Sequence, residues 1–267
     1  MAREADGYRP TIAERLPHVA CTASGPAFIH TIRRGAVWQR VLSVGGVWQS
    51  ATLFGPRRME PAFAYYRAFA RGFDLVPDAQ RLLVIGGGGF AFPKLVAAER
   101  PSVTTDAVEI DPAVIDIARR WFYLDEACEL QRVGGGALNV ICDDGRAVLD
   151  AAAPESYDIV VLDAFVGAEP VRSLATREAA VSARQALSAR GVLLANVAPG
   201  PGESFGFLQS TVATLRGPFR SVAITQVEDE RSDGENYIVL ASGAPLCLPD
   251  AIPYGTDFLG EVLHDEK

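Results

Sequence analysis

The sequence predicts a doubly wound α/β domain, built on a mostly parallel sheet, behind a small β-rich N-terminal domain. From about residue 79 onward, short apolar runs alternate with amphipathic segments, and the first of these runs ends in four consecutive glycines. Acidic residues close several of the later runs. Buried strands separated by helices are typical of a parallel sheet covered on both faces. We therefore place the N-terminal domain in residues 1–78 and the α/β domain in residues 79–267.

The N-terminal domain reads as an antiparallel meander followed by a helix. Three β-rich runs are joined by short turns that contain glycine, a pattern that favours hairpins. The runs are Ala27–Arg34, Val37–Val44 and Val47–Ala51. A helix is predicted over Met59–Phe73, because apolar residues recur there at helical spacing.

The α/β domain alternates strands and helices. The predicted strands are Arg81–Ile85, Thr105–Ile110, Leu138–Cys142, Asp158–Leu162, Val192–Val197, Val222–Gln226 and Tyr237–Ser242. The predicted helices are Phe92–Glu99, Pro112–Tyr123, Arg146–Ala152, Ala175–Arg190 and Glu203–Arg216. Asp111 before Pro112 supplies a helix cap and a first-turn proline.

Composition excludes several classes of protein. The 267 residues, 49% of them hydrophobic, suffice for a large core. The net charge of −8 argues against a nucleic-acid partner, which would show a basic face. The first residues have mixed charge, unlike a secretory signal, and no apolar run approaches the roughly 20 residues of a membrane span. We therefore expect a cytoplasmic protein with no membrane partner.

Cysteine and histidine are too sparse for a metal centre. The cysteines are scattered, without a Cys-x-x-Cys pair, and only three histidines are present. They are Cys21, Cys128, Cys142 and Cys247, with His18, His30 and His264. This usage predicts reduced thiols and no metal.

The carboxyl ends of four strands are candidate ligand sites, since ligands of such sheets bind beyond these ends. They carry Gly86–Gly89, the pair Glu109 and Asp111, Asp143-Asp144-Gly145, and Asp163-Ala164-Phe165.

The glycine run and Glu109 together predict a nucleoside-bearing cofactor. Glycines let main-chain N–H groups approach a ligand, and a carboxylate at the next strand tip can accept from both ribose hydroxyls. No Gly-Lys-Ser/Thr follows the glycines, so a P-loop is excluded. Pro93 has no main-chain N–H to donate to a pyrophosphate, so a dinucleotide is disfavoured. The alternative is a tight strand-to-helix turn without a ligand. Asp111 is assigned to capping its helix.

Two further strand ends extend the site. Asp144 can accept from an adenine amine, and Gly145 leaves room for the flat base. The alternative is that Asp143 or Asp144 caps a helix. Asp163 would face the reacting end of the ligand, or else only organise its loop. Such an array is characteristic of S-adenosylmethionine-like cofactors, which have no phosphate to neutralise.

The motifs and their order resemble the spermidine synthase-like, or polyamine aminopropyltransferase, family over about residues 35–245. The matching segments are Val84–Gly88, Val108–Asp111, Asp143–Gly145, Tyr157–Asp163 and Gly191–Asn196. The resemblance implies that Glu109 holds the ribose, that Asp144 holds the adenine amine and that Gly86, Gly87 and Gly88 lie along the cofactor. It also implies a methyltransferase-like sheet and transfer of an aminopropyl group from decarboxylated S-adenosylmethionine to a small amine, such as putrescine.

The chain departs from the family pattern where the family carries acids. At the position of Gly89 the family has an aspartate that binds the amine of the donor. At the position of Val166 it has an aspartate that acts as the catalytic base. The family's Tyr-His-Glu motif appears as Tyr65-Tyr66-Arg67.

We assign catalysis to Asp163, with Tyr65 and Tyr66, and add Gln49 to the cofactor-binding residues. Glu169 is a further acid near Asp163 in the sequence. Family members often dimerise through their N-terminal part, so the resemblance leaves open a homodimer formed by the meander with Trp38 and Trp48.

Three functions remain open from the sequence. The first is transfer of an aminopropyl-type group, from decarboxylated S-adenosylmethionine or S-adenosylmethionine, to a small amine. The second is a methyltransferase, and the third is a catalytically inert nucleoside-binding protein. A nicotinamide dehydrogenase fits less well, because no loop rich in donors for a pyrophosphate is present.

Overall fold

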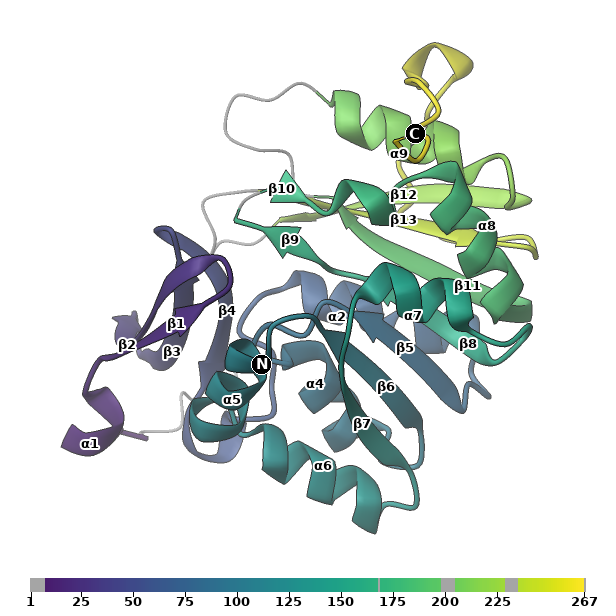
Figure 1. Ribbon diagram of the computed structural model, residues 1–267. Helices are drawn as coiled ribbons and strands as arrows, with labels where there is room; N and C mark the ends of the chain where they lie inside the picture. Colours follow the sequence, from purple (N-terminus) through teal and green to yellow (C-terminus); the bar gives the residue numbers. More distant parts are fainter. Residues whose placement is uncertain (1–7, 168, 198–204, 229–234, 267) are drawn as a thin grey trace.

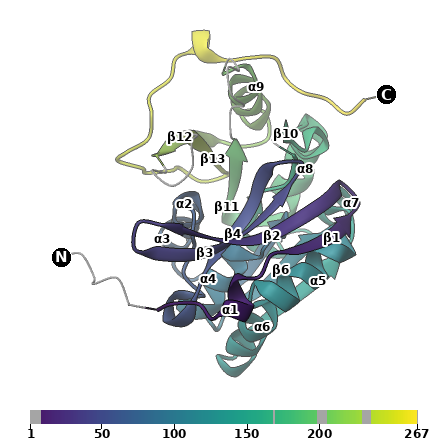
Figure 2. The same cartoon turned by 90° about the vertical axis from the view of Figure 1, so that its left-hand side faces the viewer.

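The computed structural model describes residues 8–167, 169–197, 205–228 and 235–266. A four-stranded antiparallel sheet lies to the left of a larger α/β domain in Figure 1, and Figure 2 shows that sheet from the front. The fold class predicted from the sequence is confirmed.

The N-terminal sheet has the strand order β1-β2-β3-β4, with every neighbouring pair antiparallel. Its elements are α1 (Ile12–Arg15), β1 (His18–Thr22), β2 (Gly25–Arg34), β3 (Val37–Val44) and β4 (Val47–Leu53). The predicted meander is therefore correct for three strands, and β1 was missed. β1 is a short edge strand whose side chains are half-buried at best, so no apolar run marks it.

The central sheet has seven strands in the order β12-β13-β11-β8-β5-β6-β7. Its strands are β5 (Arg81–Ile85), β6 (Thr104–Glu109), β7 (Ala137–Cys142), β8 (Tyr157–Leu162), β11 (Leu187–Val197), β12 (Ser221–Glu228) and β13 (Glu235–Ser242). β13 runs antiparallel to both of its neighbours, and the other pairs are parallel. The chain moves outward from β5 through β6 to β7 and then returns to β8 on the other side. The switch point therefore lies between β5 and β8, where such sheets bind ligands.

Helices cover both faces of this sheet (Figure 1). They are α2 (Tyr65–Ala70), α3 (Gly72–Leu75), α4 (Ala91–Glu99), α5 (Pro112–Trp121), α6 (Leu124–Val133), α7 (Gly145–Ala151), α8 (Arg177–Ala186) and α9 (Gly206–Leu215). Alternate residues of β5 enter different cores, because successive side chains of a strand point to opposite faces. Leu82 and Val84 pack with α2, α4, α5 and α6, whereas Leu83 and Ile85 pack with α7, α8 and α9.

The connections include smaller elements. Short 3-10 helices span Gly55–Arg57, Arg172–Leu174 and Thr256–Phe258. A small hairpin, β9 (Phe165–Val166) and β10 (Glu169–Pro170), follows β8.

Several predicted helix boundaries were wrong. The helix expected over Met59–Phe73 is two short helices, α2 and α3, and the chain before them forms turns and bends, with an isolated bridge between Pro61 and Thr52 of β4. The helix expected over Ala175–Arg190 ends at Ala186, and the next four residues already belong to β11. α6 was missed altogether. The first two residues of the predicted helix Glu203–Arg216 lie outside the described residues.

The N-terminal sheet shares a core with the α/β domain. Ile29 and Val41 of that sheet belong to the same buried cluster as Phe69 of α2 and Leu82 of β5. Apolar packing thus holds the two sheets against each other and fixes their relative position. None of the helices in the described part of the chain is long and apolar enough to cross a membrane.

Candidate active site

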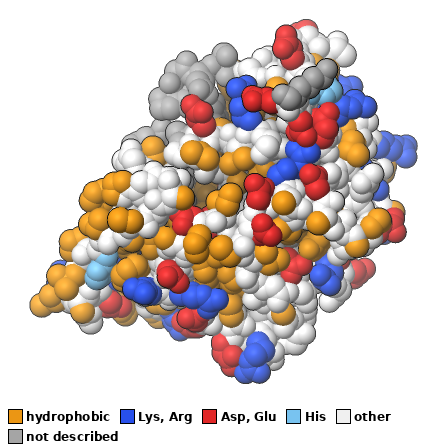
Figure 3. All heavy atoms as spheres, viewed as in Figure 1, with side chains coloured by type: hydrophobic (Ala, Val, Ile, Leu, Met, Phe, Trp, Pro, Cys, Tyr) orange, Lys and Arg blue, Asp and Glu red, His pale blue; other side chains and the backbone are white. Residues whose placement is uncertain are grey.

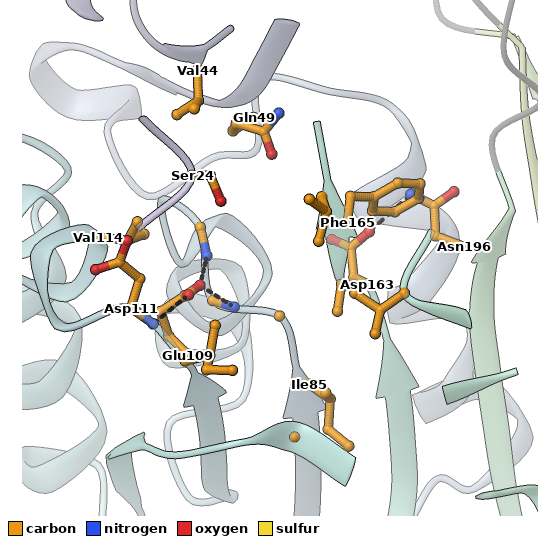
Figure 4. Close-up of a pocket in the computed structure, with 18 of the residues that line it drawn as sticks. Ser24, Val44, Gln49, Ile85, Glu109, Asp111, Val114, Asp163, Phe165 and Asn196 are labelled. Carbon is orange, nitrogen blue, oxygen red and sulfur yellow. Dashed lines mark hydrogen bonds between the residues drawn. The ribbon is translucent and has the colours of Figure 1, made fainter. Parts of the chain in front are cut away.

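A cavity of about 480 Å³ lies between the N-terminal sheet and the carboxyl ends of β5, β6 and β8. Figure 3 shows hydrophobic side chains around a hollow between the two sheets, with acidic side chains beside it. Figure 4 shows Glu109 and Asp111 on one side of the cavity and Asp163 and Asn196 on the other. We call these sides the glycine-loop end (Gly86–Gly88, Glu109, Asp111 and Asp144) and the Asp163 end (Asp163, Tyr65, Tyr66 and Asn196).

Glu109 ends β6 and receives the main-chain donors of the glycine loop. Its Oε2 accepts from the N–H groups of Gly87 at 3.1 Å and Gly88 at 2.9 Å, and its Oε1 accepts from the N–H of Asp111 at 3.0 Å. The sequence predicted that these glycine N–H groups face a ligand directly, whereas here they fix the carboxylate. A carboxylate has about four acceptor positions, so Glu109 retains about one position to accept from a ligand hydroxyl.

Gly86 brings the glycine loop against the end of β8. Its φ is +103°, and an added Cβ would lie 2.2 Å from the carbonyl oxygen of Asp163. Only glycine permits both this left-handed conformation and this close approach. The glycine-loop end and the Asp163 end are therefore parts of one site.

Asp111 caps α5, as predicted, and also joins the two sheets. Its Oδ1 accepts from the N–H of Ala113 at 2.9 Å, and its Oδ2 accepts from the N–H of Ala23, in the turn between β1 and β2, at 2.6 Å. The carboxylate thereby fastens the N-terminal sheet to the strand tip that carries Glu109.

Asp144 caps α7 and lines the cavity. Its side chain accepts from two main-chain N–H groups of the first helical turn. Gly145 also lines the cavity and packs so closely on Ile85 that an added Cβ would meet that side chain at 2.2 Å. Asp143 is exposed and is not among the described lining residues; it accepts from the N–H of Asp144 at 2.8 Å. The structure thus brings Asp144 and Gly145 to the site but not Asp143.

Asp163 follows β8 and is held by side chains. The amide Nδ2 of Asn196 donates to its Oδ1 at 2.8 Å, and the hydroxyl of Tyr65 approaches its Oδ2 at 3.4 Å. Asn236 of β13 in turn donates to the Oδ1 of Asn196 at 3.0 Å. Burial raises the pKa of Asp163 to about 7, although the hydrogen bonds from Asn196 and Tyr65 act in the opposite direction. A carboxyl group with this pKa can exchange a proton near neutral pH.

Tyr65 and Tyr66 both line the cavity beside Asp163. Their rings lie 4.1 Å apart, centroid to centroid. Burial, together with the nearby carboxylate of Asp163, raises the pKa of each hydroxyl above its usual value, so both hydroxyls stay protonated at neutral pH.

Gln49 reaches across the cavity from β4. Its Nε2 donates to the carbonyl oxygen of Gly167, in the turn of the β9–β10 hairpin, at 3.0 Å. Gln49 also lines the cavity. Trp48, which belongs to the meander considered for a homodimer, lines the cavity as well, and the homodimer stays a prediction. Glu169 is exposed on β10 and is not among the described lining residues.

Gly89 lies against β4, and it is not among the described lining residues. An added Cβ would lie 2.5 Å from the Oγ of Ser50 and 2.8 Å from Cδ1 of Phe122. A side chain at this position would therefore collide with packed neighbours before it reached the cavity.

Phe165, part of the predicted strand end Asp163-Ala164-Phe165, lines the cavity, but sequence reasoning missed three further lining residues near Asp163: Asn196, Asn236 and Phe63. One signal was available for Asn196, which stands near the end of a predicted apolar strand, as Glu109 does. Within the described residues, no group of three or more His, Cys, Asp or Glu side chains could hold a metal ion.

The sequence matches the family model described as "Spermine/spermidine synthase domain" over residues 71–213, more than half of the chain. The chain belongs to the spermine/spermidine synthase family. Within this family, the polyamine aminopropyltransferase of Vibrio vulnificus is 34% identical over 169 residues, which cover 63% of this chain and 54% of that protein. The chain thus spans about half the length of the curated relatives of this kind that it matches. Putrescine N-methyltransferase 2 of Nicotiana attenuata is 32% identical over 121 residues, covering 44% of this chain and 31% of that protein.

Solved structures show the same fold. A "probable spermidine synthase" of Corynebacterium glutamicum superposes with a TM-score of 0.70 at 21% identity, covering 86% of this chain and 81% of that one. A spermidine synthase in complex with the transition state analogue AdoDATO gives 0.59 at 16% identity, with coverages of 91% and 83%. Human methyltransferase-like protein 13 in complex with SAH gives 0.54 at 22% identity, with coverages of 70% and 86%.

Proposed function

We propose that this chain transfers an aminopropyl-type group from decarboxylated S-adenosylmethionine to the nitrogen of a small amine. The observation that carries the proposal is the position of Asp163, a half-buried carboxylate beside the glycine loop in one cavity. An acid that titrates near neutral pH can take the proton that an amine loses when it is alkylated.

The glycine-loop end fits the adenosine part of such a donor. Glu109 is fixed by three main-chain N–H groups and retains about one acceptor position for a ribose hydroxyl, while Asp144, which lines the same cavity, would accept from an adenine amine. The cavity volume of about 480 Å³ lies in the usual range for cofactor sites. The complexes of structural neighbours with AdoDATO and with SAH support an S-adenosylmethionine-related ligand.

The reaction at the Asp163 end is a displacement at carbon. The neutral amine nitrogen forms a bond to the carbon attached to the sulfonium sulfur, and the carbon–sulfur bond breaks with its electron pair going to sulfur. The proton of the alkylated amine passes to Asp163, and methylthioadenosine leaves. The hydrogen bonds from Tyr65 and Asn196 hold the Asp163 side chain in one orientation, so the carboxylate is already positioned to accept the proton.

Methyl transfer from S-adenosylmethionine is the second candidate. Gly89 provides no carboxylate for a donor amine, and Ser50 and Phe122 leave no space for a side chain at that position. The similarity to a putrescine N-methyltransferase also supports this candidate. The chemistry demanded of Asp163 is the same in both cases.

Analysis of the nucleoside product tests the proposal. The purified protein is incubated with either donor and a panel of amines, and the products are identified by mass spectrometry. Methylthioadenosine formed with an alkylated amine supports aminopropyl transfer, whereas S-adenosylhomocysteine identifies methyl transfer. Tight nucleoside binding without any product would identify a non-catalytic binding protein and overturn the proposal.

A further inference from the structure

A row of aromatic rings leads away from Asp163 along the cavity wall. The hydroxyl of Tyr65 contacts Asp163, the ring of Phe63 lies 6.0 Å from that of Tyr65, and the ring of Trp48 lies 6.5 Å from that of Phe63. All of these aromatic residues line the cavity. We call Tyr65, Phe63 and Trp48 the aromatic row. Such a wall offers apolar contact area and no hydrogen-bond acceptor beyond the Tyr65 hydroxyl.

Charge is unevenly distributed between the two ends. Among the described lining residues the carboxylates are Glu109, Asp111, Asp144 and Asp163, and all but Asp163 accept from main-chain N–H groups at the glycine-loop end. In the described part of the lining, the Asp163 end therefore has one carboxylate.

A cation stands beside the far end of the aromatic row. The guanidinium carbon of Arg34, on β2, lies 4.7 Å from the centroid of the Trp48 ring. Arg34 forms no ion pair with a carboxylate that the structure describes. Arg34 is not among the described lining residues, but a second cation that reached Trp48 would still approach a like charge.

We propose that the acceptor is a primary monoamine with an apolar body, whose nitrogen meets Asp163 and whose body lies along the aromatic row. The inference rests on the proposed function, because it names the acceptor of that transfer. It applies equally to aminopropyl and to methyl transfer, since both donors bring a sulfonium cation to the Asp163 end.

A diamine fits this site less well for a physical reason. Its distal ammonium group would lose its hydration along the aromatic row, and desolvating a charge is costly unless an opposite charge pairs with it. Arg34 adds repulsion to that cost. A monoamine of the same length replaces the distal ammonium with a methyl group, which the rings accommodate.

Calorimetry on the protein saturated with methylthioadenosine tests this inference without turnover. The probes are 1,4-diaminobutane and n-pentylamine, which has nearly the same length and lacks the second ammonium group. We expect n-pentylamine to bind at least tenfold more tightly. Equal or tighter binding of 1,4-diaminobutane would overturn the inference, as would binding of neither amine.

The substitution Arg34→Glu reverses the charge beside Trp48 and should increase affinity for 1,4-diaminobutane, while affinity for n-pentylamine changes less than twofold. Arg34→Gln is the matched control, which removes the cation without adding an acid, and it should give a smaller gain. An Arg34→Glu protein that binds methylthioadenosine normally but shows no gain for the diamine contradicts the inference.

The same titrations separate the two proposals. If methylthioadenosine binds and the diamine is preferred, only the monoamine inference fails. If neither methylthioadenosine nor S-adenosylhomocysteine binds, the proposed function fails, and the monoamine inference fails with it.

Discussion

The glycine-loop end and the Asp163 end of the cavity hold their carboxylates by different means. Glu109 and Asp144 accept hydrogen bonds from main-chain N–H groups, whereas Asp163 accepts from the side chains of Asn196 and Tyr65. Main-chain donors are fixed by the fold, while side-chain donors can be changed one at a time by substitution. The difference fits the proposed function, in which the glycine-loop end binds the nucleoside and the Asp163 end carries the reaction.

Replacement of the acid at the reacting end should have the largest effect. We expect Asp163→Asn to lower the rate of transfer by about 10²–10⁴-fold, because an amide cannot take the proton. Nucleoside affinity, measured by calorimetry, should stay within about threefold, since the fixed donors and acceptors of the glycine-loop end are untouched. Asp116→Asn, an exposed substitution on α5, is the matched control. A mutant that retains full activity would remove Asp163 as the proton acceptor.

Replacement of the acid at the binding end should instead reduce nucleoside affinity. In Glu109→Gln, the amide NH₂ faces a main-chain N–H in place of an acceptor oxygen. Loss of one charge-assisted hydrogen bond costs about 1.5–3 kcal/mol, which corresponds to a fall of about 10- to 100-fold in affinity. Calorimetry with methylthioadenosine measures this affinity. The control is Glu169→Gln, at an exposed position on β10, which should bind methylthioadenosine as tightly as the unchanged protein does. Unaltered affinity in Glu109→Gln would show that this carboxylate does not contact the ligand.

The glycine loop itself should tolerate little added volume. Gly89→Ala places a Cβ within 2.5 Å of Ser50 and 2.8 Å of Phe122, so we expect the free energy of unfolding to fall. Overpacking of this kind costs about 1–3 kcal/mol, which chemical denaturation can measure. In the control Gly217→Ala, the nearest atom is the mobile end of Arg177 at 3.1 Å, and a smaller loss is expected. Equal stabilities of the two variants would refute the packing account of Gly89.

The smallest expected effect is a shift in pH dependence. The proton acceptor must be ionised, so the rate should rise with pH and level off above the pKa of Asp163, about 7. The Asn196 hydrogen bond lowers that pKa, and its removal in Asn196→Ala should move the profile upward by about one unit. Asn139→Ala, which removes a similar bond to Asp106 outside the site, should leave the midpoint unchanged. A downward shift in Asn196→Ala would contradict this role of Asn196.

The sequence located the strands of the central sheet and most strand-end acids, because apolar runs and the residues that follow them are local features. It did not reveal that the glycine N–H groups donate to Glu109, since that contact joins two strand ends more than 20 residues apart. It also missed α6, whose buried residues include Gln131, a polar residue that bonds to the main chain of Val103. Asn236 lies at the site because β13 pairs antiparallel with β11, which places the start of β13 beside Asn196. The spacing of residues along the sequence does not predict that pairing.

The bond from the Ala23 N–H to Asp111 spans 88 positions of the chain and ties the β1–β2 turn to the strand that bears Glu109. Any ligand that steadies Glu109 will therefore also favour the docked arrangement of the N-terminal sheet, by thermodynamic linkage. Amide hydrogen exchange should consequently slow in residues 18–34 when a nucleoside binds, although most of that segment never touches it.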